Sequence, residues 1–250
     1  MVKVLGSVLG LAFAATSATA AQQQDNTTPF ERGQELYRAN CAICHQESGN
    51  GSQPIFPALN GNDLLRNTAR ITRTIQQGAN RMPPFPNLTA EDISSLATYI
   101  RSAWTNNWGA VTAEDVAGTL DDSEELARLA SVWGGVFTAT QADRGQAVYA
   151  GSCGLCHGRR LNGAPDDPDM VSTPPLARAR FLRVWAGRSL ATLYEYTRAT
   201  MPEDNPNSLT DQEYVDVIAY MLTVGGMPEG EAELRPNLQS LARVLIQPQQ

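Results

Sequence analysis

Two short stretches decide how this sequence is interpreted: Cys41-Ala42-Ile43-Cys44-His45 and Cys153-Gly154-Leu155-Cys156-His157. The chain has four cysteines and two histidines, and all of them lie in these stretches, each of the form C-x-x-C-H. Paired cysteines elsewhere indicate disulfides, a thioredoxin-like redox pair or a zinc site. A redox pair needs no histidine after it, and a zinc site needs four ligands close in space, so neither accounts for the pattern.

The pattern C-x-x-C-H is the attachment signal of c-type haem. In that chemistry the two thiols add to the haem vinyl groups as thioethers, and the adjacent histidine binds the iron from the same side. We therefore expect two covalently bound haem c groups. The residues expected to hold them are Cys41, Cys44 and His45 for the first haem and Cys153, Cys156 and His157 for the second.

The sequence around the first motif recurs around the second. The shared positions are Arg32-Gly33-Gln34, Tyr37, Cys41, Cys44 and His45 in one copy and Arg144-Gly145-Gln146, Tyr149, Cys153, Cys156 and His157 in the other. Their offset is constant at 112 (144 − 32 and 157 − 45). Met82-Pro83 matches Met201-Pro202 at an offset of 119 (201 − 82), because the second copy has a longer loop. The chain therefore contains one haem-binding unit twice.

Each copy has the pattern of a small helical domain. A first helix carries the Gly and Tyr, a middle helix is expected over 63–77 or 190–199, and a terminal helix opens with a capping box at Thr89 or Thr210. A covalent haem adds apolar core to a unit of roughly a hundred residues. We expect a mainly α fold of two tandem domains, residues 21–108 and residues 140–250, the second with a C-terminal extension.

Residues 109–139 are predicted to be a partly helical linker, because Leu126, Leu129, Ala130 and Trp133 have helical spacing. A flexible tether is the alternative. The tail from Gly225 is expected to fold back as a short amphipathic helix, since it carries Leu234, Leu238, Leu241, Leu245 and Ile246.

The first 20 residues are predicted to be a signal peptide cleaved near Ala20. They have a basic start with Lys3, an apolar run from Val4 to Ala15 and a small-x-small end. The run is shorter than the roughly 20 residues that span a bilayer, and an uncleaved anchor is the alternative. No later segment is apolar enough to span, so we expect a periplasmic protein without a transmembrane segment in its mature form. The net charge of −7 and the lack of a basic run argue against nucleic-acid binding.

The iron also needs a ligand on the face opposite the histidine. Both histidines are used, no cysteine is left over and Lys3 is the only lysine, so methionine is the leading candidate. Met82 follows His45 by 37 residues (82 − 45), and Met201 follows His157 by 44 (201 − 157). Each precedes a proline, which restricts the backbone before it to an extended form. We expect Met82 and Met201 as distal ligands, and His/Met ligation raises the reduction potential. The other candidates, poorer by position, are Met170, Met221 and Met227.

Loop prolines are expected to orient the proximal histidines. A carbonyl at Pro57, and at Pro174 or Pro175 in the second copy, would accept a hydrogen bond from the histidine ring. Trp185, with Arg183 and Arg188, is a candidate to pack beside the second haem and neutralise its propionates. The alternative is that these three are ordinary core and surface residues.

On these motifs both copies resemble class I cytochromes c. The shared features are the Gly-x-x-x-Tyr helix, C-x-x-C-H, Pro-x-Leu, the distal Met-Pro, and a terminal helix with Tyr99 or Tyr220. The resemblance covers nearly all of the chain after the signal peptide. It implies the helical cytochrome c fold, with His45 and His157 as proximal ligands.

A finer resemblance concerns dehydrogenase partners. Met82-Pro83-Pro84-Phe85 and the segment from Tyr99 to Trp104 look like the cytochrome subunits of membrane-bound alcohol dehydrogenases. The second copy resembles cytochromes associated with pyrroloquinoline-quinone dehydrogenases. Those alcohol dehydrogenase subunits carry more haems than this chain has motifs for. The resemblance implies an electron carrier with no catalytic residues, which accepts electrons from a periplasmic quinoprotein dehydrogenase and passes them to a cytochrome or a terminal oxidase.

Other functions are open at this point. One is a general dihaem shuttle that feeds a terminal oxidase without a dedicated dehydrogenase. Two enzymes, a dihaem peroxidase and a thiosulfate dehydrogenase, are less favoured. The first needs an additional histidine ligand and the second a cysteine ligand, and the chain has neither to spare.

Overall fold

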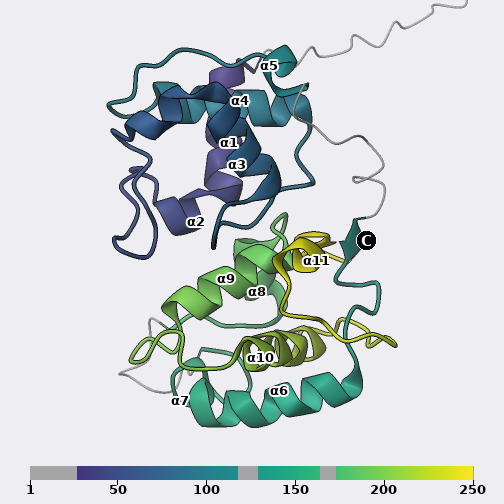
Figure 1. Cartoon of the computed structure of the whole chain (residues 1–250). Coiled ribbons are helices and arrows are strands. Elements are labelled where there is room, and N and C mark those ends of the chain that lie inside the picture. Colours follow the sequence, from purple (N-terminus) through teal and green to yellow (C-terminus); the bar gives the residue numbers. More distant parts are fainter. Residues whose placement is uncertain (1–26, 118–128, 164–172, 250) are drawn as a thin grey trace, which may run out of the picture.

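The structure is a computed structural model that describes residues 27–117, 129–163 and 173–249. Two helical units lie one above the other (Figure 1). The first unit comprises residues 29–117 and the second comprises residues 130–246. Each unit holds one C-x-x-C-H motif and has its own apolar core. The predicted mainly α fold with two tandem domains is confirmed.

The first unit is helical throughout its regular structure. Its elements are α1 (Pro29–Asn40), α2 (Ala42–His45), the 3₁₀ helix η1 (Asp63–Arg66), α3 (Thr68–Gln77), α4 (Ala90–Ser102) and α5 (Ala113–Ala117). The middle helix predicted over 63–77 is broken at Asn67, which has extended backbone dihedrals. The Asn67 side chain accepts a hydrogen bond from the Arg70 N–H and caps α3, so one predicted helix becomes two.

The second unit repeats this arrangement and adds a small sheet. Its elements are β1 (Ala130–Ser131), α6 (Ala139–Ser152), α7 (Gly154–His157), α8 (Arg178–Trp185), α9 (Leu190–Thr200), α10 (Asp211–Val224), α11 (Leu238–Ala242) and β2 (Val244–Leu245). The two strands pair in parallel, Ala130 opposite Val244. The tail folds back with a short helix as expected, although Leu245 lies in a strand.

The predicted linker helix is wrong in its last residues. Ala130 belongs to β1 and Trp133 lies in a turn. The Ala130 N–H donates to the Arg243 carbonyl and the Val132 N–H to the Leu245 carbonyl, so the C-terminal tail satisfies this backbone in place of a helix. The two ends of the predicted linker pack into the cores, through Val116 in the first unit and Phe137 in the second.

Two predictions concern residues outside the described ranges. The predicted signal peptide, residues 1–20, is one, and most of the linker segment from Asp121 is the other. Within the described ranges, no helix combines the length and apolar character that crossing a membrane requires.

The terminal helices begin where the capping boxes predicted. The Thr89 side chain accepts from the Asp92 N–H at the start of α4 while the Asp92 carboxylate accepts from the Thr89 N–H. Thr210 and Glu213 make the same reciprocal pair at the start of α10. Each box satisfies backbone donors that a helix leaves free at its N-terminus.

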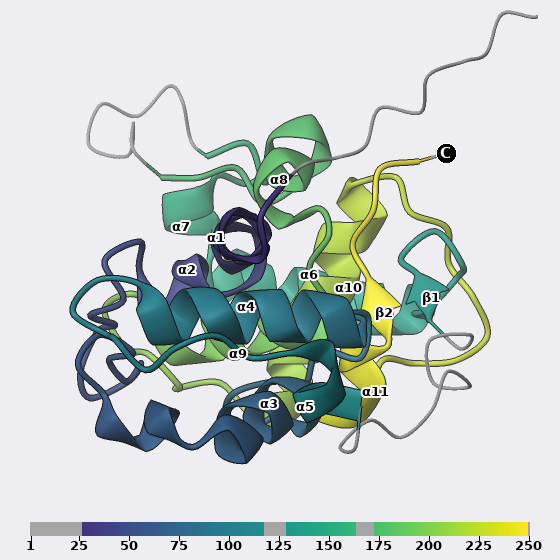
Figure 2. The same cartoon turned by 90° about the horizontal axis from the view of Figure 1, so that it is seen from above.

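The first and last helices of each unit cross in close contact. Figure 2 shows α1 end-on where it passes α4. Gly33 permits this approach, since a Cβ at that position would lie 2.0 Å from the Ser95 carbonyl oxygen. Gly145 has the same role between α6 and α10, where a Cβ would lie 1.8 Å from the Asp216 carbonyl oxygen. Glycine is therefore required at both crossings.

A buried carboxylate links the helices of the second unit. The Arg144 guanidinium donates to both oxygens of Asp216, at 2.9 Å and 3.1 Å, and also to Glu233 at 2.9 Å. The Asp216 side chain is only 5% exposed. Burial alone would raise the pKa of Asp216, but hydrogen bonds from Arg144, Gln212 and Gln141 outweigh it and hold the pKa below its usual value.

We expect Arg144→Gln to lower the stability of the second unit at neutral pH. The change leaves the buried Asp216 carboxylate without its bidentate partner, at a cost of about 1–3 kcal/mol. Because the folded-state pKa of Asp216 is lowered, this stabilisation is present above the ordinary carboxyl pKa and is lost as the pH falls through the folded-state pKa. Urea unfolding at a series of pH values should show the variant and the wild type converging below about pH 4.

The matched control is Arg32→Gln at the equivalent position of the first copy. Arg32 pairs with Asp92 at 2.9 Å, but this pair is more exposed, at 48% and 18% for the two side chains. A surface pair of this kind contributes about 0–1 kcal/mol. An Arg144→Gln variant no less stable than Arg32→Gln at neutral pH would contradict the assignment.

Candidate haem-binding sites

A single helical turn presents each C-x-x-C-H motif. Cys41 ends α1 and begins α2, and its carbonyl accepts from the Cys44 N–H at 3.1 Å and the His45 N–H at 2.9 Å. Residues at i, i+3 and i+4 of a helix share one face, so both thiols and the imidazole of the motif lie on the same side. The second motif repeats this geometry, with the His157 N–H donating to the Cys153 carbonyl at 2.9 Å.

A proline carbonyl holds each predicted proximal histidine. The Nδ1 of His45 lies 2.9 Å from the Pro57 oxygen, and the Nδ1 of His157 lies 2.9 Å from the Pro174 oxygen. The structure therefore selects Pro174 over Pro175. With Nδ1–H donating to a carbonyl, Nε2 is the nitrogen left to bind iron. Burial lowers the pKa of His45, while the Pro57 hydrogen bond opposes that shift.

A tight turn positions Met82 in the first unit. The Ala79 N–H donates to the Met82 carbonyl at 3.0 Å and the Met82 N–H donates to the Ala79 carbonyl at 2.9 Å. Gly78 precedes the turn with a positive φ of 74°, and a Cβ there would lie 2.5 Å from the Met82 oxygen. The Met82 side chain packs against the first core, which also contains Cys41.

Met201 is held differently, at the end of α9. Its backbone is extended, with φ −126° and ψ 150°, as expected for a residue before proline. The Tyr214 hydroxyl of α10 donates to the Met201 carbonyl at 2.8 Å. Two of the competing methionines, Met221 and Met227, are buried members of the second core, and Met170 lies outside the described residues.

The surroundings of the motif thiols are apolar, which suits thioether links to a haem. Cys41 is buried in the first core, and burial raises the pKa of Cys41 and of Cys44 to about 12. Burial likewise raises the pKa of Cys153 to about 11. In the described ranges no group of three or more His, Cys, Asp and Glu side chains is placed to hold a bare metal ion. The buried surroundings of the motif thiols and the carbonyl-bound histidines fit haem c.

A tyrosine in each copy holds the backbone that follows the motif. The Tyr37 hydroxyl donates to the Gln46 carbonyl at 2.6 Å, and the Tyr149 hydroxyl donates to the Gly158 carbonyl at 2.7 Å. Both acceptors directly follow the motif histidine. The Gly-x-x-x-Tyr pattern of the sequence therefore has two parts, a glycine at the helix crossing and a tyrosine that fixes the chain after the motif.

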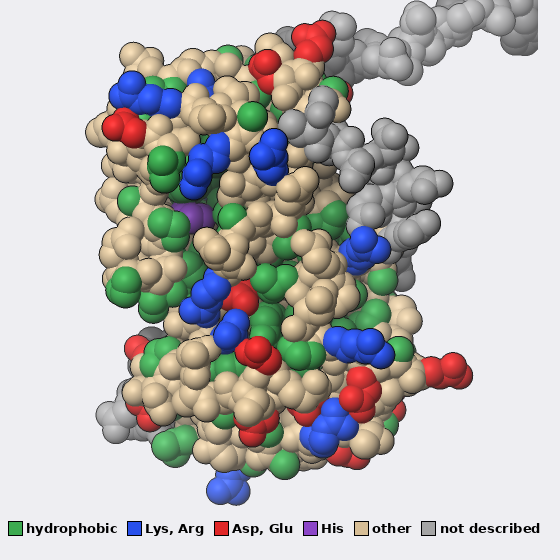
Figure 3. Space-filling view, viewed as in Figure 1, with side chains coloured by type: hydrophobic (Ala, Val, Ile, Leu, Met, Phe, Trp, Pro, Cys, Tyr) green, Lys and Arg blue, Asp and Glu red, His purple; other side chains and the backbone are tan. Residues whose placement is uncertain are grey.

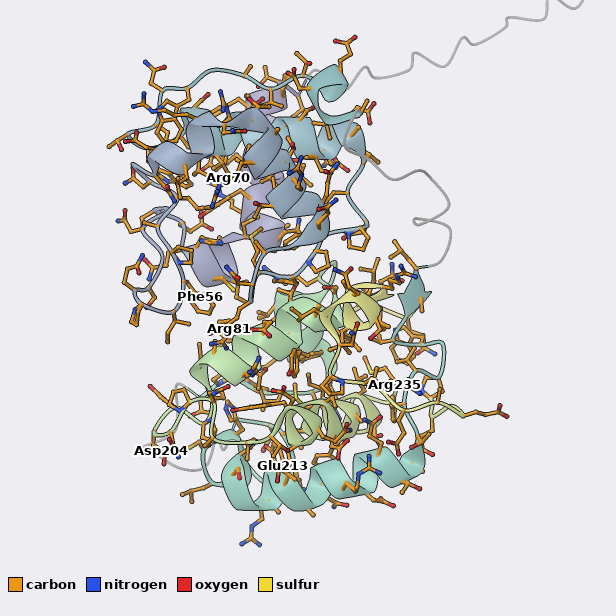
Figure 4. The ribbon with its side chains drawn as sticks, in the orientation of Figure 1. Phe56, Arg70, Arg81, Asp204, Glu213 and Arg235 are labelled. Carbon is orange, nitrogen blue, oxygen red and sulfur yellow. The ribbon has the colours of Figure 1, made fainter. Side chains whose placement is uncertain are left out.

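The two motifs have different neighbours. Ile43, within the first motif, packs against the core of the second unit. Leu155, its counterpart in the second motif, is 82% exposed. Basic and acidic side chains gather where the units meet (Figure 3), and Arg81 lies at this junction (Figure 4), where its guanidinium pairs with Glu195 of α9 at 3.0 Å. In the described part of the chain, the second unit therefore packs on the first motif through Ile43, whereas Leu155 of the second motif faces solvent.

The sequence did not reveal this contact between the units, so Arg188 was expected beside the second haem and not at the first motif. Trp185 is a core residue of the second unit, stacked with Phe181, and Arg183 is exposed. Arg188 reaches the first unit, where its guanidinium donates to the Arg38 carbonyl at 3.4 Å. A contact across 150 positions leaves no local pattern in the sequence, so no signal in a single chain would have revealed it.

Comparison with known proteins agrees with the fold and the motifs. Residues 28–100 and 140–221 match the family described as "Cytochrome C oxidase, cbb3-type, subunit III". The chain is 25% identical over 220 residues to the cbb3-type cytochrome c oxidase subunit CcoP of Azospirillum brasilense, covering 86% of this chain and 69% of that protein.

Two further relatives are named for dehydrogenases. The cytochrome c subunit of the quinone alcohol dehydrogenase of Gluconacetobacter polyoxogenes is 31% identical over 119 residues, 42% of this chain and 25% of that subunit. The thiosulfate dehydrogenase of Stutzerimonas stutzeri is 27% identical over 192 residues, 73% of this chain and 58% of that enzyme. Because the family match covers both helical units and each unit carries its own C-x-x-C-H motif, the chain belongs to the cytochrome c family described as cbb3-type oxidase subunit III and contains its domain twice.

Proposed function

We propose that the chain is an exported dihaem cytochrome c that carries electrons from a periplasmic dehydrogenase, of the quinoprotein type, to a cytochrome or terminal oxidase. The observation that supports this most is that each unit has both a carbonyl-bound histidine and a Met-Pro loop. The domains proposed are residues 21–108 and residues 140–250, with residues 1–20 removed on export.

Each haem would be held by its own unit. Cys41 and Cys44 would form the thioethers of the first haem, between His45 and Met82, and the equivalent residues of the second unit are Cys153, Cys156, His157 and Met201. A bound haem supplies an iron that takes up and releases one electron at a time. The carbonyls of Pro57 and Pro174 orient the two imidazoles, and the apolar cores of the two units would surround the haems. His45 with Met82, and His157 with Met201, would supply both iron ligands of each haem, which would favour electron transfer over chemistry at the iron.

The choice of dehydrogenase rests on the alcohol dehydrogenase relative and on the second copy's resemblance to quinoprotein-associated cytochromes. The matching part covers 25% of that relative, so the partner is inferred from the cytochrome portion alone. Two haems in one chain would accept both electrons of a two-electron oxidation. The alternative is that the protein passes electrons directly to a terminal oxidase. The CcoP relative supports this alternative.

We expect rapid reduction of the oxidised protein by a pyrroloquinoline-quinone alcohol dehydrogenase from the same organism, with its alcohol substrate present. Stopped-flow absorbance of the haem bands would follow the reaction, and the dehydrogenase without alcohol is the control. If no quinoprotein dehydrogenase of that organism reduces the haems, this donor is wrong.

The thiosulfate dehydrogenase relative favours a second candidate function, the oxidation of thiosulfate. Stopped-flow absorbance of the haem bands can test it as well. That chemistry would need a cysteine ligand beyond the four in the two motifs. We expect thiosulfate alone to leave the haems oxidised. Catalytic reduction by thiosulfate would replace the electron-carrier proposal with an enzymatic one.

A further inference from the structure

Arg188 crosses from the second unit to the first haem motif. It lies in the turn between α8 and α9, directly after Gly187, whose φ is 86°. Its guanidinium stands over the Trp185 ring at 5.9 Å and donates to the carbonyls of Val184 and of Arg38. Arg38 belongs to the last turn of α1, three positions before Cys41. The side chain therefore bridges the two units at the base of the first motif.

Arg188 is partly buried where it contacts the first unit. Its Nε is buried and has no hydrogen-bond partner in the described part of the chain. The guanidinium is thus a partly buried cation at the edge where the first haem would be attached.

The carboxylate at the same junction is already paired. Glu195 of α9, whose side chain is 6% exposed, lies 3.0 Å from Arg81 and 3.4 Å from Arg198. Across the described ranges, Arg188 makes no ion pair with an Asp or Glu side chain. Its positive charge is therefore not cancelled by an adjacent carboxylate.

The first copy offers an internal comparison. Arg66 and Arg188 each stand directly before the residue that caps the middle helix, Asn67 in the first unit and Ser189 in the second. Arg66 also lies over a tryptophan ring, that of Trp108, at 5.7 Å. It is 66% exposed and pairs with Asp63 within its own unit. Equivalent positions of the two copies therefore differ: Arg188 lies at the haem motif of the other unit, whereas Arg66 stays at the surface of its own unit.

We propose that Arg188 of the second unit completes the first haem site and raises the reduction potential of that haem. The inference rests on the proposed function, because it requires a haem at Cys41 and Cys44. Reduction adds a negative charge, which a nearby cation stabilises, and partial burial limits screening by solvent and salt. A change of about tenfold in the equilibrium constant for reduction corresponds to about 59 mV for one electron.

The test is a redox titration of the intact haem-loaded protein in four forms: wild type, Arg188→Gln, Arg188→Lys and Arg66→Gln. Variants at Met82 and Met201 identify which potential belongs to which haem. We expect Arg188→Gln to lower the reduction potential of the first haem by about 59 mV, the equivalent of a tenfold change in the equilibrium constant. The potential of the second haem should stay nearly unchanged. Arg188→Lys keeps the charge and should restore most of the shift, while Arg66→Gln should change neither potential by a comparable amount.

Three results would overturn the proposal: an unchanged first potential in folded Arg188→Gln, an equal fall of both potentials, or equal shifts in the Gln and Lys variants. The last would mean that packing alone is altered. If the Gln variant does not fold, Arg188→Lys alone still tests the proposal. A folded Lys variant whose first potential lies well below that of the wild type would contradict the role of charge. Failure of the proposed function is separate, since it would appear as a missing haem or an absent donor in the wild type.

Discussion

Gly145→Ala is expected to destabilise the second unit by about 3 kcal/mol or more, beyond the usual range for an overpacked site. The added Cβ would lie 1.8 Å from the Asp216 carbonyl oxygen and 3.0 Å from the Val217 nitrogen. Both atoms belong to the backbone of α10, so no side chain can rotate away to make room. The helices α6 and α10 would have to separate, and the core between them would open.

Gly151→Ala is the matched control, because it lies in the same helix and a Cβ there meets nothing within 4 Å. Alanine is favoured over glycine by up to about 1 kcal/mol in a helix, so this variant should be neutral or slightly stabilised. Chemical unfolding of both haem-loaded variants measures the difference. A Gly145→Ala protein as stable as Gly151→Ala would show that the helices do not cross as described.

Loss of a distal methionine should produce the largest change in redox behaviour. We expect Met82→Ala to remove the iron–thioether charge-transfer band of the first haem and to lower its potential by on the order of 0.1 V, within the about 0.8 V that axial ligands span. Met201→Ala should do the same for the second haem. The cause is the loss of a thioether that favours reduced iron. Absorption spectra and a redox titration measure both effects.

Met227→Leu provides the control for these variants. Met227 is 4% exposed in the second core and follows the Gly225-Gly226 turn. A swap of Met for Leu usually costs less than about 1.5 kcal/mol and should leave both bands in place. If a band survives Met201→Ala but disappears in Met227→Leu, the distal ligand of the second haem is Met227.

Local sequence patterns were enough to predict the helices that carry the motifs. Glycine and tyrosine four positions apart in α1 and α6 have one structural role each, and the capping boxes at Thr89 and Thr210 fix where α4 and α10 begin. These features depend on neighbours in the chain. The proline carbonyls behind His45 and His157 were predictable for the same reason, since each follows its motif within one loop.

Contacts between distant segments were not predictable from one chain. Helical spacing near Ala130 indicated a helix, yet the backbone there pairs with Val244 more than a hundred positions later. The cover that the second unit places over Ile43 likewise depends on how the units pack. The duplication predicts two equal sites, whereas in the described ranges Ile43 of the first motif packs on the other unit and Leu155 of the second motif is exposed.

The central claim is that both units are complete His/Met haem sites. A redox titration of the intact exported protein, with haem quantified per chain, tests it most directly. We predict two covalent haems per chain, an iron–thioether band that accounts for both irons, and two one-electron steps. A single haem per chain, or a thioether band from only one iron, would contradict it.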